Sequence, residues 1–103
     1  MAPFLASLAH PYASFHYEEA PLVRVNLLNK PVPATFQAFL DELGHATQQE
    51  GYRVFLFDAR GSDFISANCR ALAHAWLREY RQVIQDHVQA AAFVATWPPV
   101  QAS

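Results

Sequence analysis

The first clear pattern along the chain is a two-residue alternation over residues 22–28, LVRVNLL. One face of an extended chain here carries only Val23, Val25 and Leu27, while the other face mixes polar and apolar residues. The pattern predicts a half-buried strand. Residues 14–19 are weakly strand-like and Ala20-Pro21 indicates a turn, so we expect these two strands to pair.

Two longer segments follow the helical period instead. The first begins at Pro33, which suits the first turn of a helix, and Gly51 fits its C-terminal end. The second begins near Ser66 or Asn68, both favourable N-cap residues, and extends for about 30 Å. Apolar residues spaced for one helical face are Phe36, Phe39, Leu40, Leu43 and Thr47 in the first segment, and Leu72, Ala73, Trp76, Leu77, Tyr80, Val83, Ile84 and Val88 in the second.

Two further segments are apolar without alternation. Residues 52–58 contain four consecutive apolar residues, which favours a central strand covered by helices on both faces. Residues 90–96, AAAFVAT, predict a short buried strand that ends at Trp97. The predicted order is β-β-α-β-α-β, a small α/β layer with a four-stranded mixed sheet, two main helices and right-handed crossovers. A ferredoxin-like arrangement is the alternative.

Length and composition limit the classes of protein. A chain of 103 residues fits one domain, which we place at residues 14–97 between an arm at 1–13 and a tail at 98–103. The net charge of −2 disfavours nucleic-acid binding. One cysteine allows no internal disulfide and no cysteine zinc site. No apolar run reaches the roughly 20 residues of a membrane span, so we expect a cytoplasmic protein without a cofactor.

The predicted strand-to-helix junction, residues 58–65 or DARGSDFI, resembles that of the STAS domain. This domain occurs in anti-sigma-factor antagonists and in the cytoplasmic tails of sulfate transporters, and it shares the order β-β-α-β-α-β. Asp58, Gly61 and the apolar pair at 64–65 match the approach to the family's Asp-Ser-Ser-Gly-Leu-Gly motif. The resemblance covers residues 15–97 and implies a bacterial regulatory or scaffolding module that acts through a protein partner.

The motif itself departs from the family pattern. Ser66 stands at the aspartate, Ala67 at the phosphorylated serine, Asn68 at the second serine and Cys69 at the glycine. We therefore expect no phosphate switch at the usual serine, and Ser62 or Ser66 would substitute only in a shifted loop. STAS domains also continue beyond this last strand, so the chain is either truncated or a minimal variant.

Polar residues at the junction form a possible ligand site, whose members are Asp58, Gly61, Ser62, Asp63, Ser66 and Asn68. Such a loop could bind an anion, a nucleotide or a lipid headgroup, and its two carboxylates could hold magnesium. We favour capping instead, with Asp58 accepting from nearby amides and Asp63 or Ser66 capping the helix.

Catalytic and metal sites are disfavoured by the spacing of the candidate residues. Cys69 and His74 lie about 140° apart around a helix, so they point in different directions, and a small buried thiol is the expected role of Cys69. The histidines show no metal-binding spacing. We expect no enzyme and no metal site.

Four basic or titratable residues share one face of the second helix: Arg70, His74, Arg78 and Arg81. We refer to them as the basic stripe. Such a face suits an acidic protein partner, and the alternative is an ordinary solvated side of an amphipathic helix.

Nothing after residue 97 can cover the last predicted strand or pair with its outer edge. Exposed edges of this kind associate, so we expect a homodimer with Phe93 and Trp97 at or near the contact. The alternative is that the arm, with Phe4, Leu5, Leu8 and Tyr12, folds back over the gap.

Overall fold

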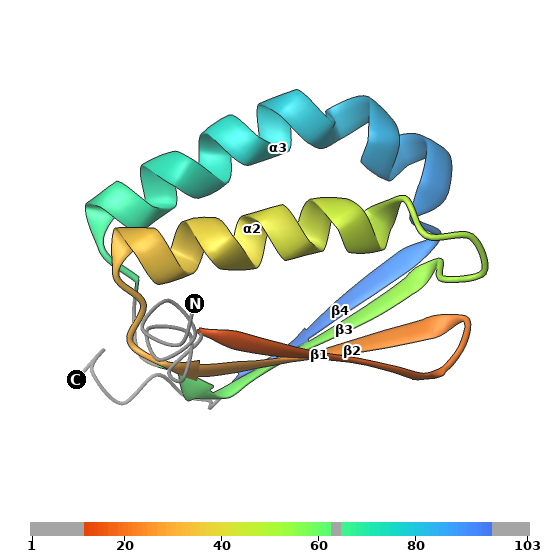
Figure 1. The fold of residues 1–103 in the computed structure, drawn as a ribbon, viewed down its shortest axis with the longest axis horizontal. Helices are drawn as coiled ribbons and strands as arrows, with labels where there is room; N and C mark the ends of the chain where they lie inside the picture. Colours follow the sequence, from red (N-terminus) through yellow and green to blue (C-terminus); the bar gives the residue numbers. More distant parts are fainter. Residues whose placement is uncertain (1–11, 63–64, 96–103) are drawn as a thin grey trace, which may run out of the picture.

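The computed structural model describes residues 12–62 and 65–95 (Figure 1). The sheet has the order β1-β2-β3-β4, with β1 antiparallel to β2 and the other neighbours parallel. The predicted element order and the mixed four-stranded sheet are confirmed. The elements are β1 (Ala13–Glu19), β2 (Leu22–Asn29), α2 (Pro33–Thr47), β3 (Val54–Ser62), α3 (Ala67–His87) and β4 (Ala90–Val94).

Both helices lie on the same face of the sheet (Figure 1). The crossovers from β2 to β3 and from β3 to β4 step in the same direction, and right-handed connections then place both helices on one side. The prediction that the central strand is covered on both faces is therefore wrong. Phe55 faces the helices and is only 2% exposed, whereas Val54 and Leu56 lie on the helix-free face and stay half-buried.

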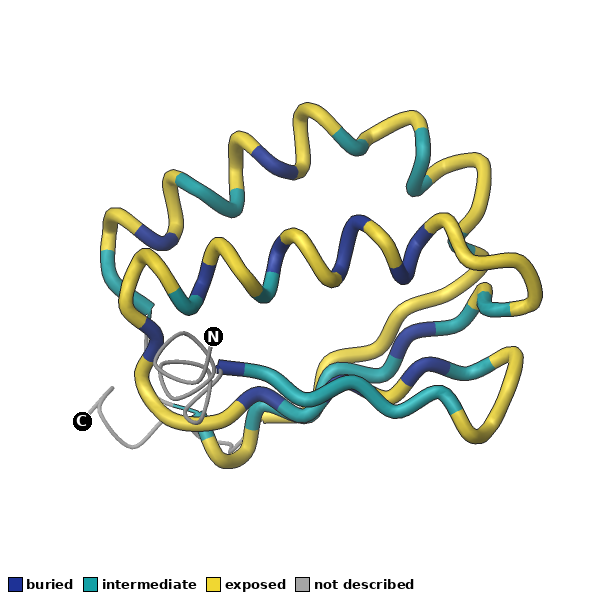
Figure 2. Tube along the Cα trace, in the orientation of Figure 1, coloured by how far each residue is buried: buried dark blue, intermediate teal, exposed yellow. Residues whose placement is uncertain are grey.

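The core is concentrated between β2, β3 and α2. Val23, Val25 and Leu27 are buried, which confirms the face predicted from the alternation. The α2 face that meets them is also buried as predicted, through Phe36, Leu40, Leu43 and Thr47. Figure 2 shows this concentration of buried positions along α2 and the middle strands.

Tyr12 and Ala13, at the end of the expected arm, also belong to this core. The Tyr12 ring is 5% exposed and lies 5.6 Å from the Phe36 ring and 5.4 Å from the Phe39 ring. Tyr12 thus packs against α2 beside β1, at the opposite end of the strand order from β4. Phe4, Leu5 and Leu8 lie outside the described residues.

Helix α3 is less deeply embedded than its wide apolar stripe suggests. Only Cys69 and Trp76 are fully buried, most of the other stripe residues are half-buried, and Leu77 is 50% exposed. The Trp76 ring stacks on Tyr80 with the centroids 4.6 Å apart. Five further residues of the stripe are partly buried and pack against the core: Leu72, Ala73, Tyr80, Ile84 and Val88.

Strand β4 is not buried, contrary to the prediction. All five of its residues are exposed, and Phe93 is 66% exposed although it faces the helix side and stacks on Phe57 at 6.0 Å. The apolar composition of β4 is that of a buried strand, but burial requires a neighbour. β4 is the edge of the sheet and pairs with β3 alone among the described strands.

Candidate interaction and ligand sites on β3 and α3

The junction that the sequence predicts as a loop after Asp58 is largely strand. β3 continues to Ser62, because Asp58, Gly61 and Ser62 pair with residues of β2. Asp58 lies opposite Asn26 and Gly61 lies opposite Leu28, so β3 holds one more residue than β2 over this interval. Such a bulge allows polar residues to remain in the sheet while their side chains reach the helix-free face.

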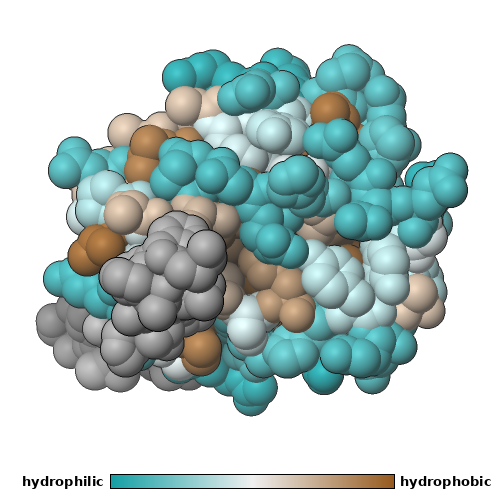
Figure 3. All heavy atoms as spheres, in the orientation of Figure 1, coloured by the Kyte–Doolittle hydropathy of each residue, from teal (hydrophilic) through white to brown (hydrophobic). Residues whose placement is uncertain are grey.

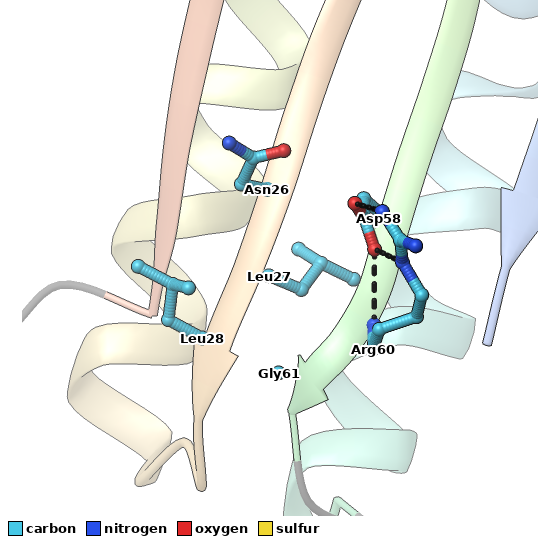
Figure 4. Close-up of a pocket in the computed structure, with 6 residues that line it drawn as sticks. All are labelled: Asn26, Leu27, Leu28, Asp58, Arg60 and Gly61. Atoms are coloured by element: carbon cyan, nitrogen blue, oxygen red, sulfur yellow. Dashed lines mark hydrogen bonds and ion pairs between the residues drawn. The ribbon is translucent and has the colours of Figure 1, made fainter. Parts of the chain in front are cut away.

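Asp58 and Arg60 form a two-point ion pair on that face (Figure 4). Arg60 Nη2 donates to Asp58 Oδ2 at 2.8 Å and Arg60 Nε donates to Oδ1 at 3.0 Å. The backbone N–H of Arg60 also donates to Oδ1, at 3.1 Å, which confirms that Asp58 accepts from a nearby amide. These hydrogen bonds, side chain first, lower the pKa of Asp58 to about 2, and the charge of Arg24 contributes further.

A shallow pocket of about 460 Å³ lies beside this ion pair. Figure 4 shows its lining side chains on the ends of β2 and β3. Arg60 belongs to the segment 60–68 that the sequence offers for ligand binding, whereas Asn26 and Leu28 were not expected to be site residues. The alternation over residues 22–28 placed Asn26 and Leu28 on the mixed face, but only the register with β3 brings them to Asp58. The lining residues are Asn26, Leu27, Leu28, Asp58, Arg60 and Gly61.

The polar network of the open face extends onto β1. His16 Nε2 lies 3.3 Å from Asn26 Nδ2 and 3.1 Å from Ser14 Oγ. Ser14 is directly opposite Asn26, and His16 is opposite Arg24, in the antiparallel pairing. The helix-free face therefore carries hydrogen-bonding groups on β1 and β2, next to the apolar Leu28, and an incoming ligand would meet both kinds of group there.

Two serines of the junction, Ser62 and Ser66, make hydrogen bonds within the fold. The Ser62 hydroxyl donates to the backbone oxygen of Asn29 at 3.2 Å and lies 3.2 Å from the Tyr12 hydroxyl. Ser66 is the N-cap of α3, as predicted, and its hydroxyl accepts from the Cys69 N–H at 3.2 Å. Burial raises the pKa of Tyr12, so this phenol stays neutral beside Ser62 at physiological pH.

The expected ligand loop is thus divided. Asp58 and Gly61 line the pocket on the sheet, whereas Ser66 and Asn68 lie at the start of α3, and Asn68 is exposed. Asp63 lies outside the described residues, as does Trp97. Within residues 12–62 and 65–95 no group of three or more potential metal ligands occurs.

Cys69 and His74 do not form a reactive pair. The Cys69 side chain is fully buried, as predicted, and His74 is exposed on a different side of α3. The thiolate is the reactive form of cysteine, and a buried thiol that neither solvent nor a base contacts is unreactive.

The four residues of the basic stripe are all exposed on α3. Arg70 donates to the backbone oxygen of Ile65 at 3.0 Å. Among the described residues, the two ion pairs present involve Arg24 and Arg60, so His74, Arg78 and Arg81 are without a carboxylate partner there. The outer surface of the helical layer is predominantly hydrophilic in the view of Figure 3.

Known structures share this architecture. The chain superposes on the anti-sigma factor antagonist SpoIIAA in its unphosphorylated form with a TM-score of 0.65, 8% identity, and coverage of 87% of this chain and 75% of that chain. The chain has the STAS fold. At this identity the likeness concerns the fold alone. No protein-family model matches the chain, and no curated protein sequence matches it.

Parts of larger proteins also resemble the STAS fold of this chain. A structure described as Mglu matches with a TM-score of 0.57 and 20% identity over 77% of this chain and 18% of that chain. Enoyl-CoA hydratase from Bacillus anthracis matches with a TM-score of 0.51 and 14% identity over 79% of this chain and 38% of that chain. This chain therefore spans well under half of the length of either protein.

Two further features of the described residues are relevant to function. Helix α3 begins at Ala67, which is exposed and has no hydroxyl group. None of the described helices is long and apolar enough to span a membrane.

Proposed function

We propose that the chain is a non-enzymatic protein-interaction module with a STAS fold, and that the basic stripe of α3 docks an acidic protein partner. The observation that carries the proposal is the exposure of Arg70, His74, Arg78 and Arg81 on one side of a 21-residue helix. Three of them have no carboxylate partner within the described residues. The helix thus offers its cationic groups to another molecule.

The chemistry of the stripe favours carboxylates as its target. A guanidinium group presents a planar fork of donors that matches a carboxylate at two points. Arg78 and Arg81 lie three residues apart, so they are neighbours on the helix surface. Charge complementarity of this kind raises the association rate and fixes the orientation of the partner.

We further propose that the module is not switched at the usual STAS serine. That position corresponds to Ala67, which has no hydroxyl to phosphorylate. The nearby hydroxyls are engaged, because Ser66 caps α3 and Ser62 bonds to Asn29 and lies beside Tyr12. Modification of either serine would first have to break contacts that stabilise the fold.

The described residues also supply no clear acid–base machinery, which supports a non-enzymatic role. The Asp58 carboxylate has a pKa of about 2 because Arg60 holds it, so it is a weak general base at neutral pH. Cys69 is buried, whereas His74 is exposed on a different side of α3. A reaction centre would need groups that these residues do not bring together.

Binding of a small anionic ligand, such as a nucleotide or a lipid headgroup, is the alternative function. The pocket beside Arg60 favours it, although only Asp58 and Gly61 of the six expected site residues line this pocket. A thermal-shift screen separates the two functions, because a ligand that binds only the folded chain raises the melting temperature. A rise with a nucleotide or with lysophospholipid that disappears in Arg60→Ala would support the alternative.

The proposal is tested with a charge-reversed double variant, Arg78→Glu with Arg81→Glu. Its matched control is Lys30→Glu with Arg53→Glu, which changes the net charge equally at exposed positions outside α3. Both are compared with the parent chain for binding to immobilised poly-L-glutamate and for capture of proteins from a lysate of the source organism.

We expect the stripe variant to lose about tenfold in affinity, since two charge contacts at about 0.5–1 kcal/mol each are removed. The loss should shrink as salt is added. Both variants should unfold at the same denaturant concentration as the parent within error. Equal binding by the stripe variant and the control variant would exclude the stripe as the docking site.

A further inference from the structure

Strand β4 is an edge without the usual protection against pairing. Natural edge strands carry charges, prolines or bulges that discourage a second strand from adding to them. β4 has the sequence AAAFV, in a chain of which 16% of residues are charged, and all five residues are exposed. The residues that pair it to β3 follow a regular register from Ala90 to Val94 without a bulge. The edge is therefore straight, uncharged and accessible.

The backbone of β4 has hydrogen-bonding groups directed away from β3. The N–H of Ala90, the first residue of β4, donates to the backbone oxygen of Arg53 at 3.4 Å, on the β3 side. Because these groups alternate in direction along an extended strand, those of Ala92 and Val94 also face β3, and those of Ala91 and Phe93 face outward. No described strand lies on that outer side to receive them.

We propose that a second copy of the chain pairs antiparallel with β4 about a twofold axis at Ala92. A twofold axis perpendicular to the sheet keeps both helical layers on the same side, and it places one residue of β4 opposite its own copy. Centring on Ala92 pairs all five residues of the strand. The product is one continuous eight-stranded sheet, since each copy contributes four strands.

The sequence of β4 fits its own antiparallel copy in this register. Phe93 lies opposite the partner's Ala91 on the helix side, and Val94 lies opposite the partner's Ala90 on the helix-free side. The large residues at one end of the strand thus meet the small residues at the other end. No charge faces its own copy, which a twofold contact would otherwise penalise. Phe93, now 66% exposed, gains a neighbour on the side away from Phe57.

This dimer deepens the expectation of self-association at Phe93 and is independent of the basic stripe. The stripe variant of α3 should remain dimeric, because its substitutions lie outside β4. Conversely, a β4 variant that becomes monomeric should still bind poly-L-glutamate through each copy. Failure of one proposal therefore leaves the other intact.

The first test uses charge at the axis. Ala92 is exposed on the helix-free face, so Ala92→Lys and Ala92→Glu leave the monomer core untouched. We expect the parent chain to sediment as a dimer at micromolar concentration and each variant alone to sediment as a monomer, because like charges oppose each other at the axis. Mixing the two variants should restore a dimer. Ala38→Lys, exposed on α2, is the matched control and should stay dimeric.

The second test fixes the register by cross-linking. The two Ala92 residues at the axis form a non-hydrogen-bonded antiparallel pair, in which opposite Cα atoms lie about 4.5 Å apart, a distance that a disulfide can bridge. Ala92→Cys should therefore form a covalent dimer under mild oxidation, while Ala90→Cys should not, because it faces the partner's Val94. The parent chain, whose Cys69 is buried, is the baseline.

Several outcomes would overturn the proposal. They are a monomeric parent chain at micromolar concentration, a dimer that persists in both charge variants, and mixed variants that stay monomeric. Equal cross-linking at positions 90 and 92 would exclude the register centred on Ala92. Circular dichroism and thermal melting of each variant confirm that a loss of association is not a loss of fold.

Discussion

Tyr80 of α3 packs directly on Gly44 of α2, so that a Cβ atom at position 44 would lie 2.8 Å from the Tyr80 hydroxyl oxygen. The next ring atom would be 2.9 Å away, so a rotation of the hydroxyl alone cannot relieve the contact. Trp76 stacks on the Tyr80 ring with the centroids 4.6 Å apart, which limits how far the ring can move. The separation of the two helices therefore depends on the absence of a side chain at Gly44.

Replacement of Gly44 by alanine should destabilise the chain by about 1–3 kcal/mol, because the new methyl group overpacks a close helix contact. The change should have the opposite sign in a Tyr80→Ala background. There the space is free, and alanine is the better helix former by roughly 0.8–1 kcal/mol. Urea unfolding of the four members of this mutant cycle measures both effects. A destabilisation that is the same in both backgrounds would contradict the contact.

The pKa of Asp58 should rise from about 2 toward its usual value of 3.8 when Arg60 is replaced by alanine. The folded-state pKa lies below the unfolded value, so the ion pair stabilises the fold fully above pH 3.8 and loses this contribution as the pH falls toward about 2. The carboxyl chemical shift of Asp58, followed by NMR through that window, measures the change. Arg24→Ala should produce a smaller rise, because its charge is the weaker influence.

Tyr12 should contribute through its ring more than through its hydroxyl. Tyr12→Phe removes the contact with Ser62 but keeps the packing on Phe36 and Phe39, so we expect a loss of about 0.5–1.5 kcal/mol. Tyr12→Ala should cost about 3–5 kcal/mol, as for other buried aromatic residues. Denaturant unfolding distinguishes these values. Similar losses for both variants would mean that the hydrogen bond, and not the ring, anchors the start of β1.

Ser66 should stabilise α3 as its N-cap. Ser66→Ala removes the acceptor of the Cys69 N–H and should cost about 1 kcal/mol, whereas Ser66→Asp keeps an acceptor and should be close to neutral. Asn68→Ala, two residues further along the chain and exposed, is the control and should change stability little. Thermal melting of the three variants ranks them, and an equal effect of both alanine substitutions would contradict the capping role.

Local patterns predicted the elements well where one face of an element is uniformly apolar. The alternation of Val23, Val25 and Leu27 identified β2, and the spacing of Phe36, Leu40 and Leu43 identified the buried face of α2. Both patterns correspond to faces that are buried in the structure, because β2 and α2 pack against each other. The N-cap role of Ser66 was also predictable, because capping depends on a few adjacent residues.

The wrong predictions depend on which elements lie next to a segment in the fold, and a local sequence pattern does not contain this information. The run at residues 54–57 is apolar on both faces, yet the helices cover only one face, because strand order decides on which side each crossover lies. The polar residues after Asp58 resemble a loop, but pairing with β2 keeps them in the sheet. The apolar β4 has the composition of a buried strand and lies at an edge. The pocket could not be predicted for the same reason. Only the pairing register of β2 with β3 brings Asn26 and Arg60 to the same pocket.

The placement of β4 has a further consequence for how the chain opens. One ladder of backbone bonds to β3 and the stacking of Phe93 on Phe57 hold these five residues, whereas β2 is paired on both sides and covered by α2. Elements with few apolar contacts open locally at a lower free energy than the core does. The amide hydrogens of β4 should therefore exchange with solvent through openings that leave β1, β2 and α2 intact. Protection of the backbone amides against hydrogen exchange should therefore decrease from β2 to β4. The strand that is most accessible for association is also the least protected strand in the isolated chain.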